Sequence, residues 1–443
     1  MAQSPAMTSP SRLTGALVAA LVVMLVAACG TSSPSAALTP TPAPAGSPAA
    51  AICDEAVAGS PATTQAPGDP DAATYAGIEA QVQELRGITA TTPIARGVLD
   101  AAGLCTYLRG VLRRENPEEQ SLASEKLLKH LLLIPANTSL NQLYLNLYAS
   151  QAIGLYDNID KQMYVVSRGG AIGPAEEVTY AHEFTHALQD QAFDLTTFRG
   201  TTPDQGDRKL ARTALAEGDA TLLMTLWEQQ HLSPDELLQT AGTADPATLA
   251  ALQSLPAIIK DPLMSVYLTG LTPVLAAYGK GGFKAVDDLY RNPPDSTEQI
   301  LHAGKLASRE APVTVTIPDD LGTRMGDGWT VSMQDTLGEF QLEIVAREGG
   351  ASEPGDAAAG WGGDRIALLE GPGGETAVVL DTAWDTTKDT DEFAAAIEAT
   401  AVKLNAAGRS AKVLRPGENR VVLVSAETAD AMGRLAKALG LAG

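Results

Sequence analysis

Apolar positions in the first part of the chain recur at steps of three and four residues, the period of an amphipathic helix. Ile78 and Val82 begin this pattern, and Val98 and Cys105 continue it. The spacing predicts a helical N-terminal region over residues 72–149.

The middle of the chain combines one strand pattern with several helical ones. Gln162–Ser167 is a short apolar run typical of a strand, and Pro174 followed by two glutamates suits the first turn of a helix. Helical spacing then continues to about Arg291, including a run from Leu210 to Trp227. Turns are predicted at Tyr156–Asp160, Pro203–Asp204, Ser233–Pro234, Asp261–Pro262 and Gly279–Gly282.

The last third has a different pattern. We expect helices at Leu337–Ala346, Asp391–Leu404 and Glu427–Leu439, and strands at Arg365–Leu369, Thr376–Leu380, Ala411–Leu414 and Arg420–Ser425. Glycine and proline between paired strands indicate two hairpins. The chain is therefore predicted to be α+β and mostly helical, with a separate C-terminal α+β domain of repeated ββα order at residues 311–443.

The N-terminus has the pattern of a targeting segment. The apolar run Ala16–Ala28 is too short to span a membrane and ends at Cys29. This resembles a bacterial lipoprotein signal, with residues 1–28 removed and Cys29 lipidated; ordinary secretion with an incidental cysteine is the alternative. The next segment, residues 29–71, is rich in Pro, Ala, Ser and Thr and is expected to act as a tether. The resulting protein would be anchored by lipid on the extracytoplasmic side of the cell membrane.

Composition excludes several classes of function. The 443 residues carry a net charge of −22, which argues against binding nucleic acid or gripping anionic lipid through a basic patch. Gly360–Arg365 is glycine-rich but lacks a phosphate-loop lysine, so no nucleotide site is predicted. We expect a tight turn there that packs Trp361 and pairs Asp364 with Arg365 or another residue.

Cysteine usage is sparse. With Cys29 assigned to lipidation, Cys53 and Cys105 remain as an even pair in an oxidising compartment. A single disulfide between them is predicted, with two unpaired thiols as the alternative.

The sequence HEFTHALQDQ contains the arrangement with the clearest chemistry. His182 and His186 are four residues apart, so on a helix both imidazoles face the same side and can bind one metal ion. Glu183 lies about 100° around the helix, beside the metal rather than on it. A carboxylate there can accept a proton from zinc-bound water and pass it to a leaving amine. Two packed surface histidines are the structural alternative.

A catalytic zinc site needs a third protein ligand. No further histidine follows closely, so a carboxylate is expected. Glu217, within ALAEGDA, lies among apolar residues of a predicted helix and is the candidate, unless it faces solvent.

HEFTHALQDQ with the downstream Glu-Gly-x-Ala resembles the gluzincin metallopeptidases, and it is close to the helix of the thermolysin-like members. The strings GLYDNIDKQMYVVSRGG, PPDSTEQILH and GWGGDR are similar to an uncharacterised family of bacterial secreted or lipidated gluzincin-like proteins. The resemblance implies a zincin-like metallopeptidase domain at residues 150–310, zinc as cofactor and Glu217 as third ligand. It also implies that an edge strand, matched here by Met163–Ser167, binds the peptide substrate.

Further site roles follow from the helix positions and the resemblance. Asp190 is one turn past His186 and is a candidate to orient an imidazole, and Asp219 is a second supporting carboxylate. Gluzincins usually add a histidine or tyrosine that stabilises the oxyanion. His302 is the candidate we select, although a capping box at Ser296–Gln299 explains part of its motif. The other candidates are His231, Tyr164, Tyr180, Tyr267 and Tyr278.

The sequence thus predicts a membrane-anchored, extracytoplasmic zinc peptidase. It would hydrolyse peptide bonds through a zinc-bound water with Glu183 as general base, acting on a peptide or protein substrate. A catalytically silent zincin scaffold that binds a peptide or envelope partner is the alternative. A solute-binding lipoprotein is disfavoured by the zinc signature and by the lack of two similar α/β lobes.

Overall fold

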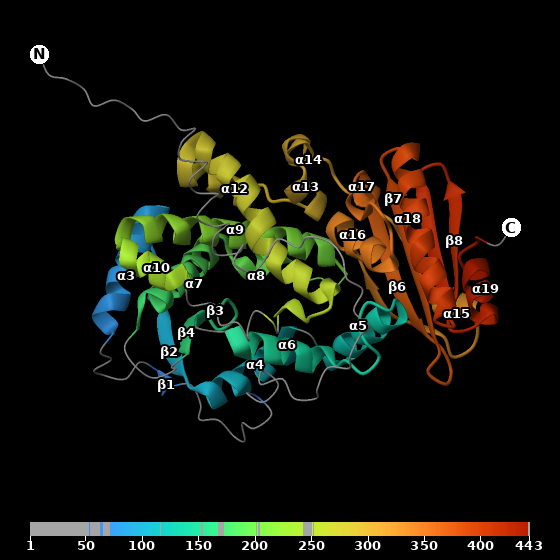
Figure 1. Cartoon of the computed structure of the whole chain (residues 1–443), viewed down its shortest axis with the longest axis horizontal. Helices are drawn as coiled ribbons and strands as arrows, with labels where there is room; N and C mark the ends of the chain where they lie inside the picture. Colours follow the sequence, from blue (N-terminus) through green and yellow to red (C-terminus); the bar gives the residue numbers. More distant parts are fainter. Residues whose placement is uncertain are drawn as a thin grey trace, which may run out of the picture.

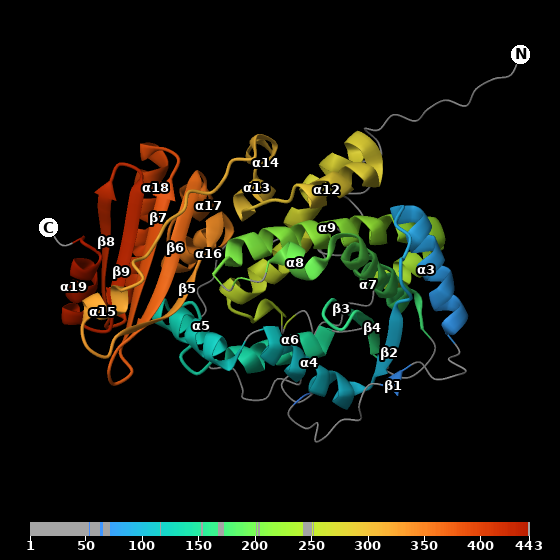
Figure 2. The same ribbon diagram turned by 180° about the vertical axis from the view of Figure 1, so that it is seen from behind.

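The computed structural model describes residues 53, 63–64, 71–115, 117–151, 154–166, 172–200, 202, 204–241, 250 and 252–441. Within these ranges the chain is mixed α+β. A mostly helical part with a small sheet lies at one end, and a larger sheet lies at the other (Figures 1 and 2). Cys29 and the predicted signal and tether segments lie outside the described residues, except for residues 53, 63–64 and 71.

The helical part has a small sheet of order β1-β2-β4-β3. Its strands are β1 (Thr63–Thr64), β2 (Ala95–Leu99), β3 (Gly154–Asp157) and β4 (Gln162–Val166). Its helices are α3 (Ala72–Arg86), α4 (Ala101–Glu115), α5 (Glu118–His130), α6 (Leu140–Gln151), α7 (Pro174–Phe193), α8 (Leu195–Arg199), α9 (Gly206–His231), α10 (Pro234–Ala241), α12 (Ala257–Arg291), α13 (Thr297–Leu301) and α14 (Ala303–Ser308).

Two local expectations are wrong in this sheet. Val98 was placed in the helical region, but it belongs to β2, which pairs in parallel with β4. Tyr156 was placed in a turn, but it lies in β3 and pairs with Met163 of β4. β4 is therefore an interior strand, and β3 rather than Met163–Ser167 forms the edge. Strands this short are identified by their partners rather than by their own periodicity.

The helices α9 and α12 pack backbone against backbone. A Cβ on Gly270 would lie 1.8 Å from the carbonyl oxygen of Ala214, and a Cβ on Gly218 would lie 2.3 Å from the carbonyl oxygen of Gly270. Only glycine permits this approach, which lets α12 lie directly along the helix that carries Glu217. Figure 1 shows the two helices side by side.

The predicted breaks in α12 have different outcomes. Asp261–Pro262 was expected to form a turn, but both residues lie inside the helix. The glycine break is confirmed in part, because Gly281 and Gly282 leave helical geometry and kink the helix there.

The C-terminal part is an antiparallel sheet of order β5-β6-β7-β9-β8. Its elements are α15 (Leu321–Met325), β5 (Thr330–Asp335), α16 (Gly338–Gly349), α17 (Pro354–Ala358), β6 (Trp361–Glu370), β7 (Thr376–Trp384), α18 (Thr387–Ala406), β8 (Ser410–Gly417), β9 (Arg420–Ala426) and α19 (Ala429–Ala438). Both predicted hairpins and all three predicted helices are confirmed, whereas β5 was missed.

Helices cover both faces of this sheet, as Figures 1 and 2 show. Along β6, Ile366 and Leu368 face the core formed with α16 and α18, while Ala367 and Leu369 face the core formed with α15 and α19. Burial on both faces explains why the central strands are almost continuously apolar.

The first of these cores also contains α5, which is far away in the sequence. His130 at the end of α5 is 1% exposed, and its ring nitrogens lie 2.8 Å from Thr376 Oγ1 and 2.9 Å from Ser425 Oγ. Burial lowers the pKa of His130 to about 3, so the imidazole is neutral. His130 is therefore a packed structural residue, and α5 links the two parts of the chain.

The joint between the two parts is built on buried carboxylates. Asp207 of α9 accepts hydrogen bonds from the Thr297 backbone and hydroxyl, and a Cβ on Gly338 would lie 1.8 Å from it. Asp364 accepts from the backbone N–H groups of Leu337 and Gly338 and from the Trp361 indole. The glycine-rich string therefore packs Trp361 as expected, and the partners of Asp364 are these donors. The expected tight turn is wrong, because Trp361–Arg365 is the beginning of β6 and pairs with β7.

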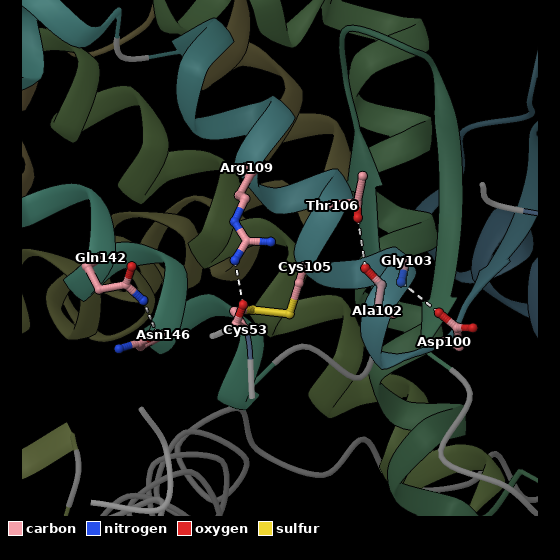
Figure 3. The surroundings of a disulfide bond; sticks show 9 residues. All are labelled: Cys53, Asp100, Ala102, Gly103, Cys105, Thr106, Arg109, Gln142 and Asn146. Carbon is pink, nitrogen blue, oxygen red and sulfur yellow. Dashed lines mark hydrogen bonds between the residues drawn. A yellow bond between two sulfur atoms is a disulfide. The ribbon is translucent and has the colours of Figure 1, made fainter. Parts of the chain in front are cut away.

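The predicted disulfide is present. Cys53 and Cys105 are bonded, and Arg109 on the same helix donates to the carbonyl oxygen of Cys53 (Figure 3). This bond attaches a segment near the N-terminus to α4. In the described part of the chain, no helix is both long and apolar enough to cross a membrane.

Candidate metal centre

Three predicted ligand atoms meet at one point between α7 and α9. His182 Nε2 and His186 Nε2 are 3.1 Å apart, and each lies 3.2 Å from Oε2 of Glu217. The two histidines are one turn apart on α7, whose first residue is Pro174 and whose first turn carries acidic residues. The helix period alone therefore brings the imidazoles together, whereas helix packing brings Glu217 to them.

The triangle fits a tetrahedral zinc ion. Zinc binds imidazole nitrogen and carboxylate oxygen at about 2.0–2.2 Å, which places neighbouring ligand atoms of a tetrahedron about 3.3 Å apart. The measured edges of 3.1–3.2 Å nearly match this spacing. The same three side chains form a potential metal-binding group whose ligand atoms lie within 4.8 Å of one another.

The charges in the cluster favour a cation at the point where the three side chains meet. Burial lowers the pKa of His186, but the Glu217 and Glu183 carboxylates together outweigh burial and raise this pKa to about 9. Burial raises the pKa of Glu217, but the imidazoles outweigh it and hold this pKa well below its ordinary value. The three groups together therefore attract a cation to the point where they meet.

Gln189 orients His186, and the sequence analysis missed it. Its amide donates to the Ala216 carbonyl (3.0 Å) and to Asp219 Oδ2 (2.9 Å), which directs its oxygen to His186 Nδ1 at 2.8 Å. His186 therefore keeps a proton on Nδ1, so the proton that a metal ion would displace is the one on Nε2, which faces the cluster. The available signal was the i+3 position after a predicted ligand, which places the amide on the same helical face.

Asp219 supports the site through Gln189. It is fully buried and bonds with the Arg86 guanidinium through both oxygens, and it accepts the Tyr290 hydroxyl at 2.9 Å. Asp287 also pairs with Arg86 at 2.7 Å. Asp219 therefore does not contact His186 directly but acts on it through Gln189. It belongs to a network that joins α3, α9 and α12.

Asp190 does not orient an imidazole. It accepts hydrogen bonds from the Tyr156 hydroxyl (2.7 Å), the Lys161 ammonium and the Leu195 backbone N–H. Asp190 therefore anchors the β3–β4 hairpin to α7. The prediction was wrong because Asp190 leans toward the hairpin, a partner that helical spacing cannot reveal.

The anchored hairpin in turn holds Glu183. The backbone N–H of Tyr156 donates to Glu183 Oε2 at 2.8 Å. Restricted access to solvent raises the pKa of the Glu183 carboxyl, and the neighbouring imidazoles oppose this shift. Glu183 is thereby fixed beside the cluster but does not contribute an atom to the triangle.

These groups line one pocket. Its walls are formed by Tyr156, Asn158, His182, Glu183, His186, Leu195, Arg199, Glu217 and Tyr267. Tyr267 comes from α12; its ring lies 6.1 Å from the His182 ring, and the Glu217 carboxylate raises the pKa of its hydroxyl. The phenol therefore keeps its proton and can donate a hydrogen bond into the pocket.

Of the predicted oxyanion candidates, Tyr267 is the one that lines this pocket. His302 lies elsewhere and bonds to Glu339 of α16 at 2.7 Å, so its predicted site role is not supported. Its motif belongs to the joint between the two parts of the chain. The remaining candidates contact other residues: Tyr180 bonds to Glu79, His231 packs on Trp227, Tyr164 packs on Tyr107 and Tyr278 packs on Phe283.

A second cluster of carboxylates binds a lysine side chain. Glu298, Glu310 and Asp385 have carboxylate oxygens close together, but the Lys305 ammonium lies among all three. The lysine supplies the positive charge that this cluster needs.

The match to a known family lies in the C-terminal part of the chain, away from the candidate metal centre. A family model described as a domain of unknown function (DUF8575) matches residues 327–436, which contain the five-stranded sheet and none of the ligand triangle. No curated protein and no solved structure matches the chain.

Proposed function

We propose that this protein is a zinc-dependent peptidase. The observation that carries the proposal is the triangle formed by His182, His186 and Glu217, with edges of 3.1–3.2 Å and with Glu183 on the wall of the same pocket. Two imidazoles, one carboxylate and a neighbouring second carboxylate are the set that hydrolysis of a peptide bond by a gluzincin-type site requires.

Each residue has a distinct role in the proposed reaction. The Nε2 atoms of His182 and His186 and Oε2 of Glu217 would hold zinc, which supplies Lewis acidity toward the scissile carbonyl and water. Glu183 takes the proton of the attacking water and delivers it to the leaving amine. Tyr267 donates a hydrogen bond to the oxygen on which negative charge develops.

Variants of ligand and base separate these roles. His186→Ala and Glu217→Ala should lose zinc and activity together. Glu183→Gln should keep zinc and fold but lose roughly 10²–10⁴-fold in rate. His231→Ala is the matched control, because it removes an exposed histidine of α9 outside the pocket.

Zinc content and digestion of a peptide library would be measured for each variant. Hydrolysis by Glu183→Gln at the parent rate would refute the hydrolytic mechanism. Full zinc occupancy in Glu217→Ala would show that the third ligand lies elsewhere. Bound zinc without turnover of any peptide would favour the silent scaffold.

We also propose that Cys29 carries a lipid that holds the protein on the extracytoplasmic side of the membrane. The apolar run that ends at Cys29 supports this assignment. Cys29→Ala should release the protein from the membrane fraction or leave an unprocessed precursor. Unchanged processing and retention would exclude the anchor.

A further inference from the structure

The pocket at the ligand triangle is small. Its volume is about 130 Å³. Pockets that bury a drug-sized ligand usually measure about 300–1,000 Å³. The space beside Glu183 therefore suits one terminal residue rather than the middle of a long peptide.

Arg199 brings unused hydrogen-bond donors into this space. It is the last residue of α8, and its side chain is 24% exposed. Its Nε is buried and has no hydrogen-bond partner among the described residues. Its Nη2 forms a long ion pair with Glu217 Oε1 at 3.9 Å, which is beyond hydrogen-bond range.

Two other arginines near the site are paired with carboxylates at hydrogen-bond distance. Arg86 lies between Asp219 and Asp287, and Arg212 bonds to Asp295 and to two backbone carbonyl groups. A guanidinium presents five N–H groups in a planar fork that matches a carboxylate. The unpartnered Nε of Arg199 and its place on the pocket wall therefore point to an anionic, planar ligand in the pocket.

The charge of the pocket agrees with this ligand. Glu183 and Glu217 supply two negative charges to the pocket wall, and Arg199 supplies one positive charge. With a divalent ion at the triangle, the pocket carries one net positive charge, which a single carboxylate would neutralise. The backbone in the middle of a peptide is uncharged and could not neutralise this charge.

The distances allow this ligand to be the end of the substrate. Arg199 Nη2 is 3.9 Å from the second oxygen of the proposed ligand Glu217. A carboxylate bound to Arg199 would therefore lie beside the ligand triangle, and one extended residue spans at most about 3.6 Å, which is enough to connect the two places.

We propose that Arg199 binds the terminal carboxylate of the substrate and that the protein removes single residues from the C-terminus of peptides. This inference rests on the proposed peptidase function. The bond between the last two residues breaks, the water oxygen adds to the penultimate carbonyl carbon, and Glu183 transfers the water proton to the new amine. The products are a free amino acid and a peptide shortened by one residue.

Binding tests this role independently of turnover. Zinc-loaded Glu183→Gln protein would be titrated with one short peptide as its free acid and as its C-terminal amide. The free acid should bind roughly 10- to 100-fold more tightly, because the amide lacks the charge-assisted bonds to Arg199. Adding Arg199→Gln should remove the difference, whereas Arg291→Gln, an exposed arginine of α12, should preserve it.

Digestion supplies the second readout. Free-acid peptides should shorten from the C-terminus, amidated peptides should resist, and Arg199→Gln should mainly raise KM. Equal binding and cleavage of acid and amide would overturn the role of Arg199 and leave the peptidase proposal standing. Loss of zinc from Arg199→Gln would also overturn it, because Arg199 would then act on Glu217. Failure of every peptide to react, with acid-selective binding retained, would refute the peptidase and keep the carboxylate site.

Discussion

Replacing Gln189 by leucine should weaken zinc binding without removing any metal ligand. The change keeps the approximate volume of the side chain but deletes three hydrogen bonds, to His186 Nδ1, the Ala216 carbonyl and Asp219. His186 would lose the acceptor that keeps its proton on Nδ1. Its Nε2 lone pair would then no longer be directed to the triangle by a fixed partner.

The size of the effect follows from these contacts. Loss of a partner that orients a ligand typically costs 10–100-fold in metal affinity, or about 1.4–2.7 kcal/mol. A buried imidazole N–H without an acceptor should lower the free energy of unfolding by a further ~1–3 kcal/mol. Asp219 keeps its bonds to Arg86 and Tyr290, so the network around it should survive.

Two measurements distinguish loss of orientation from general damage. Zinc affinity is obtained by competition with a chelator, and the free energy of unfolding is obtained by urea titration of chelator-treated protein. Gln191→Leu is the control, because Gln191 lies on the same helix and bonds to Thr91 and Thr92 rather than to a histidine. Parent-like zinc affinity in Gln189→Leu, or an equal loss in Gln191→Leu, would refute the reasoning.

Three further changes test the surrounding fold. Gly270→Ala should lower the free energy of unfolding by about 1–3 kcal/mol in urea titration, because its Cβ would lie 1.8 Å from a carbonyl oxygen of α9; Gly279→Ala, which meets no atom within 4 Å, should not. Burial raises the pKa of Glu228 from 4.5 to about 7, so stability present at acidic pH should fall by up to about 3 kcal/mol as pH rises through this interval. Glu228→Gln should lack this fall, and parallel pH profiles of the two proteins would contradict the assignment. Reducing the Cys53–Cys105 disulfide, which closes a loop of 52 residues, should lower stability by about 4 kcal/mol while zinc content stays constant; an unchanged melting temperature under reductant would contradict this.

Features with a local cause could be predicted from the sequence. His182 and His186 share a face because the helix period places every fourth residue there, whatever surrounds the helix. The C-terminal hairpins were also predictable, since glycine and proline mark their turns and both strands of each pair are apolar. The Cys53–Cys105 bond followed from counting cysteines in one compartment.

Features that depend on distant partners could not be predicted in this way. Val98 was assigned to a helix because β2 becomes a strand only beside β4, and Asp190 was assigned to a histidine because its hairpin partner was not visible. His302 has a motif as suggestive as that of Glu217, yet it bonds to Glu339.

The sequence by itself therefore determined the two imidazoles and the adjacent Glu183 carboxylate, because helical geometry is local and needs no partner. The tertiary structure decided which carboxylate completes the triangle, which amide orients His186 and which arginine enters the pocket. Glu217 reaches the histidines on α9, a helix that packs against both α7 and α12, and Arg199 keeps free donors because no acidic residue packs within hydrogen-bond range of it among the described residues. Both outcomes arise from packing between helices, whose register is set by side chains far apart in the chain.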